Sequence, residues 1–236
     1  HWNPMEDEWQ LFDTRSDYSL MNDLASEHPE KLEELKKLFL KVAEENKAFP
    51  IGGAMYVGLN PHEAKSSTNT EWTLFEGMTR IPESEAPNVR TGTLRVEIEA
   101  EVPENVNGVL FAMGGYAGGV SLYALDGELY YEYSALLLKR DKIKVGNLPA
   151  GDVTIAYEMR TPMEPAAPAE LSFWINGNEA AKGTVQRTVP LIFTASETFD
   201  VGMDTLSPVA DAYFDQAPFS FEGTLKKLHF EYLEAE

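Results

Sequence analysis

The most constraining feature of this sequence is a strict alternation of apolar and charged residues over Thr93–Val102. The stretch reads TLRVEIEAEV, so every second side chain from Leu94 onward is apolar, and the side chains between them are Arg or Glu. Successive side chains of a β-strand point to opposite faces, and the pattern therefore predicts one apolar and one solvated face. Antiparallel sheets that cover a core on one side have such strands. We expect the chain after this strand to extend the same sheet system, and the chain before it to be something else.

Several short stretches after this first strand also have strand character. Val109–Met113 reads as a buried strand, and Val153–Arg160 alternates again. The dipeptides Asp126-Gly127 and Asn176-Gly177 each separate two apolar alternations, which is a strong hairpin signal. Further strands are predicted in TVPLIF (188–193), TFDVGM (198–203) and FSFEGTLKKLHFEYL (219–233).

These strands, at least nine in all, predict a mainly β fold. Short strands with turns between them favour an antiparallel two-sheet β-sandwich, of the concanavalin-like jelly-roll type. The sandwich is preceded by a helical N-terminal extension. We expect two parts, a helical segment with its following loop at 1–60 and the β-sandwich at 61–236.

The extension contains one amphipathic helix, predicted from about Pro29 to Glu45. Its apolar residues recur at helical spacing, and a proline suits the first helical turn, where its missing N–H costs nothing. Ser26 and His28 are the candidate caps, and Glu33 with Lys37 is the expected i,i+4 pair. A single amphipathic helix cannot bury its own apolar stripe, so it should dock on the sandwich or on a partner domain.

Composition excludes several classes of function. The formal net charge of −20 argues against nucleic acid as a partner, because phosphate binding needs clustered Lys and Arg. No run of about 18 apolar residues exists, which excludes a membrane-spanning helix. The absence of cysteine removes disulfides, thiol catalysis and cysteine-rich zinc sites, and leaves both the bacterial cytoplasm and the periplasm open as compartments. The chain begins at His1, which we interpret as a cut edge.

No metal or catalytic site follows from residue spacing. The four histidines, His1, His28, His62 and His229, are scattered without metal-ligand spacing. The glycine-rich run 114–119 precedes a predicted strand, so it is read as a connection between strands and not as a phosphate cradle. Asp200 and Asp204 flank a loop that is interpreted as a turn built by side-chain hydrogen bonds, with a calcium loop as the alternative.

Aromatic side chains offer a different kind of candidate, a face that stacks on sugar rings. Most of them are expected to fill the sandwich core instead. The candidates are Tyr130, Tyr131, Tyr133, Trp174, Tyr213 and Phe214.

Three stretches resemble the C-terminal region of bacterial type I arylsulfatases, the formylglycine-dependent sulfatases. The first has the pattern W-x-L-Y/F-D, then N-D/L-x-A, then a helix that begins P-E-K-L. The second reads E-G-M-T-R-I-P-E and A-P-N-V, and the third D-x-G-x-D-T-x-x-P-V. The matching residues are Trp9, Leu11–Asp13, Asp17, Asn22–Ala25 and Pro29–Leu32, then Glu76–Glu83 and Ala86–Val89, and finally Asp200–Val209.

The resemblance implies a parent enzyme that hydrolyses sulfate esters with a formylglycine nucleophile and a divalent metal, which we expect to be calcium. Both would lie upstream, since this chain has no cysteine, no S-x-P-x-R signature and no Asp-Asp dipeptide. We therefore assign no catalytic, cofactor-binding or metal-binding residue here. The expected function is a non-catalytic C-terminal fragment that supports the fold or borders the active site, inert alone. Its partners would be the upstream catalytic domain and, as a further option, a second copy in a homo-oligomer.

Two alternatives stay open at this point. One is a free-standing carbohydrate-binding or lectin-like sandwich, for which fold-level analogy is a weak warrant. Its binding of sulfated polysaccharide is disfavoured by 39 acidic against 19 basic residues. The other is an interaction scaffold, in which a partner chain covers the apolar face of the helix.

Overall fold

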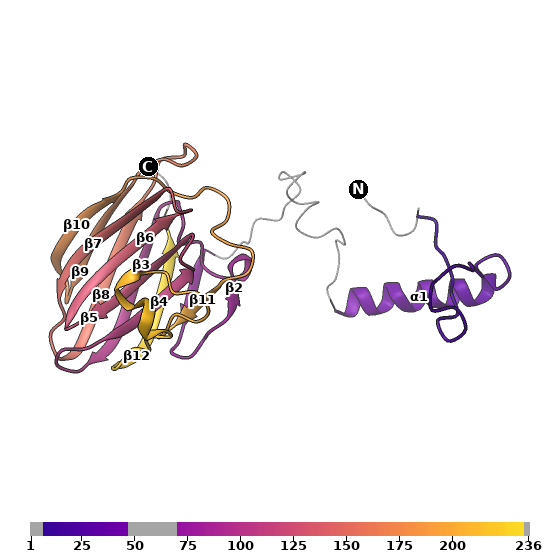
Figure 1. The fold of residues 1–236 in the computed structure, drawn as a ribbon, viewed down its shortest axis with the longest axis horizontal. Coiled ribbons are helices and arrows are strands. Elements are labelled where there is room, and N and C mark those ends of the chain that lie inside the picture. Colours follow the sequence, from indigo (N-terminus) through magenta and orange to yellow (C-terminus); the bar gives the residue numbers. More distant parts are fainter. Residues whose placement is uncertain (1–6, 47–69, 234–236) are drawn as a thin grey trace. The chain divides into compact units, whose positions relative to one another are not determined.

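The computed structural model describes residues 7–46 and 70–233, and the chain divides into two units, 1–68 and 69–236 (Figure 1). The domain boundary predicted between residues 60 and 61 lies outside the described residues. None of the described helices is long and apolar enough to cross a membrane.

In its described residues, the first unit has the helix α1 (Pro29–Glu45), which confirms the predicted bounds. His28 stands at the N-cap position, but no side chain makes a capping hydrogen bond there. Glu33 pairs with Lys36, 2.9 Å away, and not with the predicted Lys37. Residues three apart on a helix are also neighbours, so the i,i+3 partner competes on equal terms.

The segment before the helix contacts it through Trp9 and is held together by hydrogen bonds within the segment itself. The Trp9 ring packs edge-on against Phe39 of α1, with the ring centroids 5.2 Å apart. The backbone N–H of Leu11 donates to the Asp23 carboxylate at 2.9 Å, and Leu24 N–H donates to the Leu11 carbonyl at 2.7 Å. The N–H donors of Leu11 and Ala25 hold the pKa of the Asp23 carboxyl below its usual range. These contacts hold the W-x-L-F-D stretch (9–13) against the N-D-L-A stretch (22–25).

The second unit is a β-sandwich of two antiparallel sheets with six strands each (Figure 1). Sheet A has, in spatial order, β1 (Glu71–Leu74), β12 (Thr224–Tyr232), β3 (Leu94–Val102), β8 (Gly151–Arg160), β9 (Ala169–Ile175) and β10 (Asn178–Val185). Sheet B has β2 (Ile81–Pro82), β11 (Thr198–Val201), β4 (Gly108–Gly114), β5 (Gly119–Leu125), β6 (Glu128–Ala135) and β7 (Lys139–Asn147). Two short 3₁₀ segments, η1 (Glu83–Glu85) and η2 (Asp211–Gln216), lie in the connections. The predicted jelly-roll sandwich is confirmed.

Strand β3 lies inside sheet A, between β12 and β8. Its apolar residues, from Leu94 to Val102, are at most 2% exposed, whereas Arg95, Glu97, Glu99 and Glu101 are on the solvated side. The predicted alternation is therefore the observed one. Both hairpin turns are also confirmed: the φ angles are 51° and 77° at Asp126-Gly127, and 50° and 76° at Asn176-Gly177. A two-residue turn with both φ angles positive matches the twist of the flanking strands.

An aromatic cluster joins the two sheets at the centre of the core. The ring of Phe111 in sheet B lies 5.7 Å from Phe230 and 6.3 Å from Tyr157, both in sheet A. Phe199 stacks on the same ring from within sheet B, at 5.7 Å. Offset and edge-on pairs at such distances are the favoured aromatic geometries. The two sheets are therefore held by interdigitated rings as well as by aliphatic packing.

Two sequence predictions about strands were wrong. Strands β1 and β2 precede β3 and belong to the sandwich, because they pair with β12 and β11, strands more than 100 residues further along the chain. Residues 188–193 form no strand. Pro190 has no N–H to donate, and the N–H groups on either side of it donate to side chains: Val189 to the Tyr133 hydroxyl (2.8 Å) and Phe193 to the Glu83 carboxylate (3.1 Å).

Candidate functional site

Two of the arylsulfatase-like stretches meet in the fold, although more than 100 residues separate them. Strand β2 pairs with β11, with Ile81 opposite Phe199. The Val201 N–H donates to the Met78 carbonyl at 2.9 Å. We call this assembly of residues 76–83 and 198–209 the brace. It forms one end of sheet B, since β2 and β11 are the first two strands in its order.

Asp200 is the centre of the brace. Its carboxylate is 1% exposed and accepts four hydrogen bonds. The Arg80 N–H donates to Oδ1 at 2.6 Å. The N–H and the hydroxyl of Thr205 donate to Oδ2 at 3.2 and 2.7 Å, and the Thr198 hydroxyl completes the set at 3.2 Å. Both oxygens are engaged by protein donors, which is the hydrogen-bonded turn that we preferred from the sequence.

The calcium alternative at Asp200 and Asp204 has little support in this geometry. A calcium ion takes six to eight oxygen ligands, and at Asp200 it would compete with four protein donors for the carboxylate oxygens. Within the described ranges, no group of three or more acidic or histidine residues is placed to hold a metal ion.

Asp204 closes a loop that crosses the outer face of sheet B. We call this loop, residues 202–219, the strap. The Asp204 N–H donates to the Pro218 carbonyl at 2.8 Å, which ties the two ends of the strap together. Oδ2 of Asp204 accepts from the Val209 N–H at 2.8 Å and from the Tyr213 hydroxyl at 2.6 Å. The other oxygen, Oδ1, is buried and has no hydrogen-bond partner in the described part of the chain.

Burial raises the pKa of the Asp204 carboxyl to about 7. The hydrogen bonds from Tyr213 and Val209 lower this pKa, while the neighbouring carboxylates of Asp200 and Glu197 raise it further. The physical cause is the cost of a charge without solvent, which favours the neutral acid. Near neutral pH, the strap is therefore fastened by a carboxyl group that is partly protonated.

The strap covers apolar and aromatic residues that a sandwich would otherwise expose. Tyr213 packs edge-on against Tyr123 of β5 at 5.0 Å, and Phe219 stacks on Tyr213 at 5.0 Å. Together with neighbouring residues of β4 and β5 they form a second apolar cluster outside the main core. The strap thus acts as a third layer over part of sheet B.

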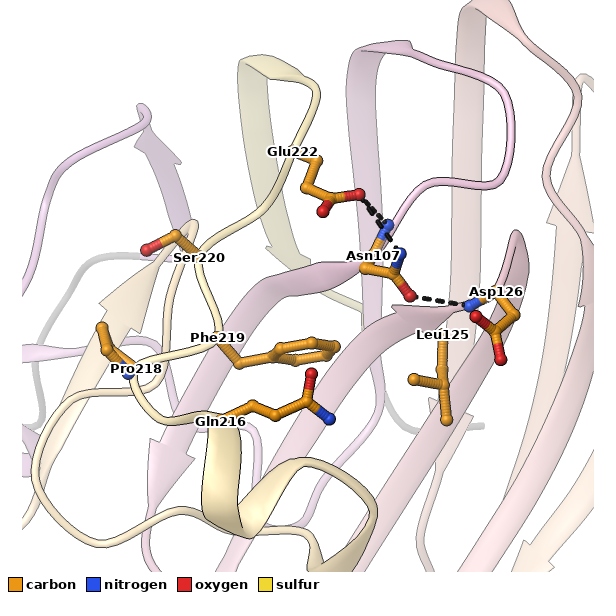
Figure 2. Close-up of a pocket in the computed structure, with 8 residues that line it drawn as sticks. All are labelled: Asn107, Leu125, Asp126, Gln216, Pro218, Phe219, Ser220 and Glu222. Atoms are coloured by element: carbon orange, nitrogen blue, oxygen red, sulfur yellow. Dashed lines mark hydrogen bonds between the residues drawn. The ribbon is translucent and has the colours of Figure 1, made fainter.

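A pocket opens where the end of the strap meets the β5–β6 turn, and Figure 2 shows the side chains around it. Its volume is about 620 Å³, within the range of about 300–1,000 Å³ that is usual for small-molecule sites. The lining residues are Asn107, Leu125, Asp126, Gln216, Pro218, Phe219, Ser220 and Glu222. They come from three separate segments of the chain.

Asn107 fixes the rim of this pocket. Its N–H and side-chain amide donate to Oε2 of Glu222, at 2.9 and 3.2 Å. Its Oδ1 accepts from the Asp126 N–H at 2.8 Å. Figure 2 shows this chain of contacts from Glu222 through Asn107 to Asp126. The β3–β4 loop, the β5–β6 turn and the segment before β12 are therefore held in one arrangement.

The predicted aromatic candidates are dispersed. Tyr131, Tyr133 and Tyr213 are at most 1% exposed and serve the core or the strap, as expected for most of the set. Trp174 is half-buried in sheet A, with the Arg95 guanidinium 5.7 Å from its ring. Tyr130 and Phe214 keep exposed surface, and neither lines the pocket. The aromatic residue that does line it, Phe219, was not among the candidates, because nothing local in FSFEG distinguishes a pocket residue from a strand residue.

The other sequence candidates have structural roles. The glycine-rich run 114–119 is the β4–β5 hairpin, closed by a 2.9 Å hydrogen bond from the Gly115 N–H to the Gly118 carbonyl. The predicted connection between strands is confirmed. His229 lies in β12 with Nδ1 3.3 Å from the Thr73 hydroxyl, and His28 precedes α1. His1 and His62 lie outside the described residues.

No known family model matches the chain, and no curated protein matches it in sequence. Among solved structures it is similar to the CBM40 of Ruminococcus gnavus IT-sialidase bound to α2,3-sialyllactose, with 15% identity over 70% of this chain and 92% of that one, at a TM-score of 0.48. Domains LG4-5 of the mouse laminin α1 chain are similar at 14% identity, covering 71% of this chain and 43% of that one, with a TM-score of 0.46. The Caenorhabditis elegans galectin LEC-6 is similar at 10% identity, covering 71% and 99%, with a TM-score of 0.40. At such identities a likeness extends to the fold alone.

Proposed function

We propose that this chain is the non-catalytic C-terminal part of a bacterial arylsulfatase, with the sandwich as an appended domain that supports the enzyme. The proposal rests on the three stretches that resemble this family. The parent enzyme would hydrolyse sulfate esters, and the partner of this part would be the catalytic domain upstream of it.

The observation that carries the proposal is the brace. Two of the resembling stretches, far apart in the sequence, contact each other through Asp200, Arg80 and the β2–β11 pairing. A chance likeness would have no reason to fall on two stretches that form one structural unit. The same contacts explain these residues as architecture, so they supply no catalytic group.

The residues of this chain do not fit the metal and formylglycine chemistry of the parent. A sulfatase nucleophile needs the C/S-x-P-x-R signature, and the metal needs an Asp-Asp pair with further ligands. Neither motif occurs here, and no metal-binding group occurs in the described residues. No reaction step is assigned to this chain.

We expect the purified chain to release no 4-nitrophenol from 4-nitrophenyl sulfate above the rate of a buffer blank. An active arylsulfatase assayed in the same buffer with calcium serves as the positive control. Turnover that co-elutes with the chain through two different chromatography steps would contradict the proposal that it is inert alone.

Glycan binding by the sandwich is the second candidate function, and the pocket in Figure 2 favours it. A concave site with apolar and convergent polar groups is the usual form of a small-ligand site. This function is compatible with a support role in a larger enzyme, and equally with a free-standing binding module.

A further inference from the structure

We propose that the pocket beside the strap binds an uncharged, hydroxyl-rich sugar and excludes sulfated or carboxylated ones. This inference rests on the second candidate function, glycan binding, and names the ligand class and the residues that select it. It is independent of whether a sulfatase domain lies upstream.

The pocket is arranged in advance of any ligand. The Asn107 contacts to Glu222 and Asp126 fix the rim. Phe219 has a φ of 44°, in the left-handed region that a bulky side chain rarely adopts. The hydrogen bond from the Val109 N–H to the Phe219 carbonyl (2.9 Å) and the stacking on Tyr213 hold it there. Backbone strain kept in place by its surroundings is most frequent at ligand-binding positions.

The charge of the lining residues determines which ligand charge the pocket accepts. Two of the eight lining residues, Asp126 and Glu222, are acidic, and none is Lys, Arg or His. The Asp126 carboxylate and Oε1 of Glu222 accept no hydrogen bond from a described residue, so they are available to a ligand. Such a rim repels sulfate and carboxylate groups and favours groups that donate hydrogen bonds. The chain's net charge of −20 acts in the same direction.

The apolar part of the lining sets the shape of the ligand. Phe219 and Leu125 face each other across the pocket, and the Gln216 amide lies beside the ring (Figure 2). A sugar presents C–H groups to apolar contacts and hydroxyls around its edge, which both donate and accept. The hydrogen-bond acceptors that line the pocket lie on three separate segments of the chain. The Gln216 side-chain amide can also donate a hydrogen bond. A compact ammonium ion is a single point charge, so it would satisfy fewer of these groups at once.

The test is calorimetric titration of the whole chain with four neutral tetrasaccharides built from glucose, galactose, mannose and xylose. A sulfated carrageenan tetrasaccharide and spermidine are the charged probes. The variants are Gln216→Ala and Asp126→Asn, the second of which keeps an Asn-Gly turn. Asp215→Ala is the matched control, because this exposed acidic residue is adjacent to Gln216 and does not line the pocket. Thermal unfolding of each variant establishes that it is folded.

We expect saturable binding of at least one neutral tetrasaccharide. Each pocket variant should raise its Kd about tenfold, the loss of roughly one good hydrogen bond, while the control stays within about twofold. Tighter binding of the sulfated probe would overturn the ligand class but leave glycan binding standing. No saturable binding of any saccharide, or binding of spermidine alone, would overturn both. Binding that is insensitive to the two pocket variants would overturn the assignment of the site.

Discussion

Replacing Asp200 with alanine is expected to lower the free energy of unfolding by about 2–6 kcal/mol. The substitution removes the acceptor for four hydrogen bonds and leaves the N–H groups of Arg80 and Thr205 without their partner. A buried donor left unsatisfied costs about 1–3 kcal/mol, and the two left here are part-buried, which places the expected loss toward the lower end of this range. Urea unfolding followed by tryptophan fluorescence measures the change.

Asp211→Ala is the control for this experiment, since Asp211 is an exposed acidic residue in the strap. It should change the stability by no more than about 0.5 kcal/mol. If Asp200→Ala were as mild as the control, the brace would not hold β2 and β11 together. The structural explanation of the arylsulfatase-like stretches would then be wrong.

The second large effect expected is a pH dependence that comes from Asp204. Its pKa is about 7 in the folded chain against an ordinary value of 3.8, so the folded state retains a proton that the unfolded chain loses. The contribution of Asp204 to the free energy of unfolding is complete below about pH 4. It falls as the pH rises and is lost above about pH 7. The expected loss is on the order of a few kcal/mol.

Asp204→Asn mimics the neutral acid and cannot titrate, so its stability relative to the wild type should improve from pH 5 to about pH 7 and then level off toward pH 8. The comparison of the two chains removes the contribution of other carboxyls, such as Asp23, whose pKa is shifted downward. Asp211→Asn should follow the wild-type profile. Parallel profiles for wild type and Asp204→Asn would show that Asp204 is ionised in the folded chain throughout this range.

The sequence predicted those elements whose backbone geometry depends on only a few consecutive residues. The alternation in Thr93–Val102, the apolar stripe of Pro29–Glu45 and the Asp-Gly and Asn-Gly turns each impose a backbone geometry on a few consecutive residues. All of these elements appear with the expected bounds or within one residue of them. They were sufficient to predict the sandwich.

The errors occurred where distant contacts decide the structure. Strands β1 and β2 are only four and two residues long, too short to give a reliable periodicity, and they pair with the edges that β12 and β11 offer. Residues 188–193 look like a strand, but their N–H groups are taken by the side chains of Tyr133 and Glu83. Neither outcome is visible in a window of ten residues.

The pocket could not be predicted at all. Asn107, Asp126, Gln216 and Phe219 are up to 112 residues apart, and apart from the hairpin turn at Asp126 none belongs to a recognisable motif. The aromatic candidates were chosen by residue type, which cannot tell a core position from an exposed one. Tyr131 illustrates this limit, because it is 0% exposed and its replacement would test folding and not glycan binding.

The most direct test of the proposed origin is to read the coding sequence immediately upstream of His1 in the source DNA. The proposal predicts an in-frame continuation that encodes a C/S-x-P-x-R signature and an Asp-Asp pair, as a sulfatase catalytic domain requires. An in-frame start codon or stop codon directly before His1 would contradict it. The chain would then be a self-contained sandwich with a helical extension, and glycan binding would become its leading function.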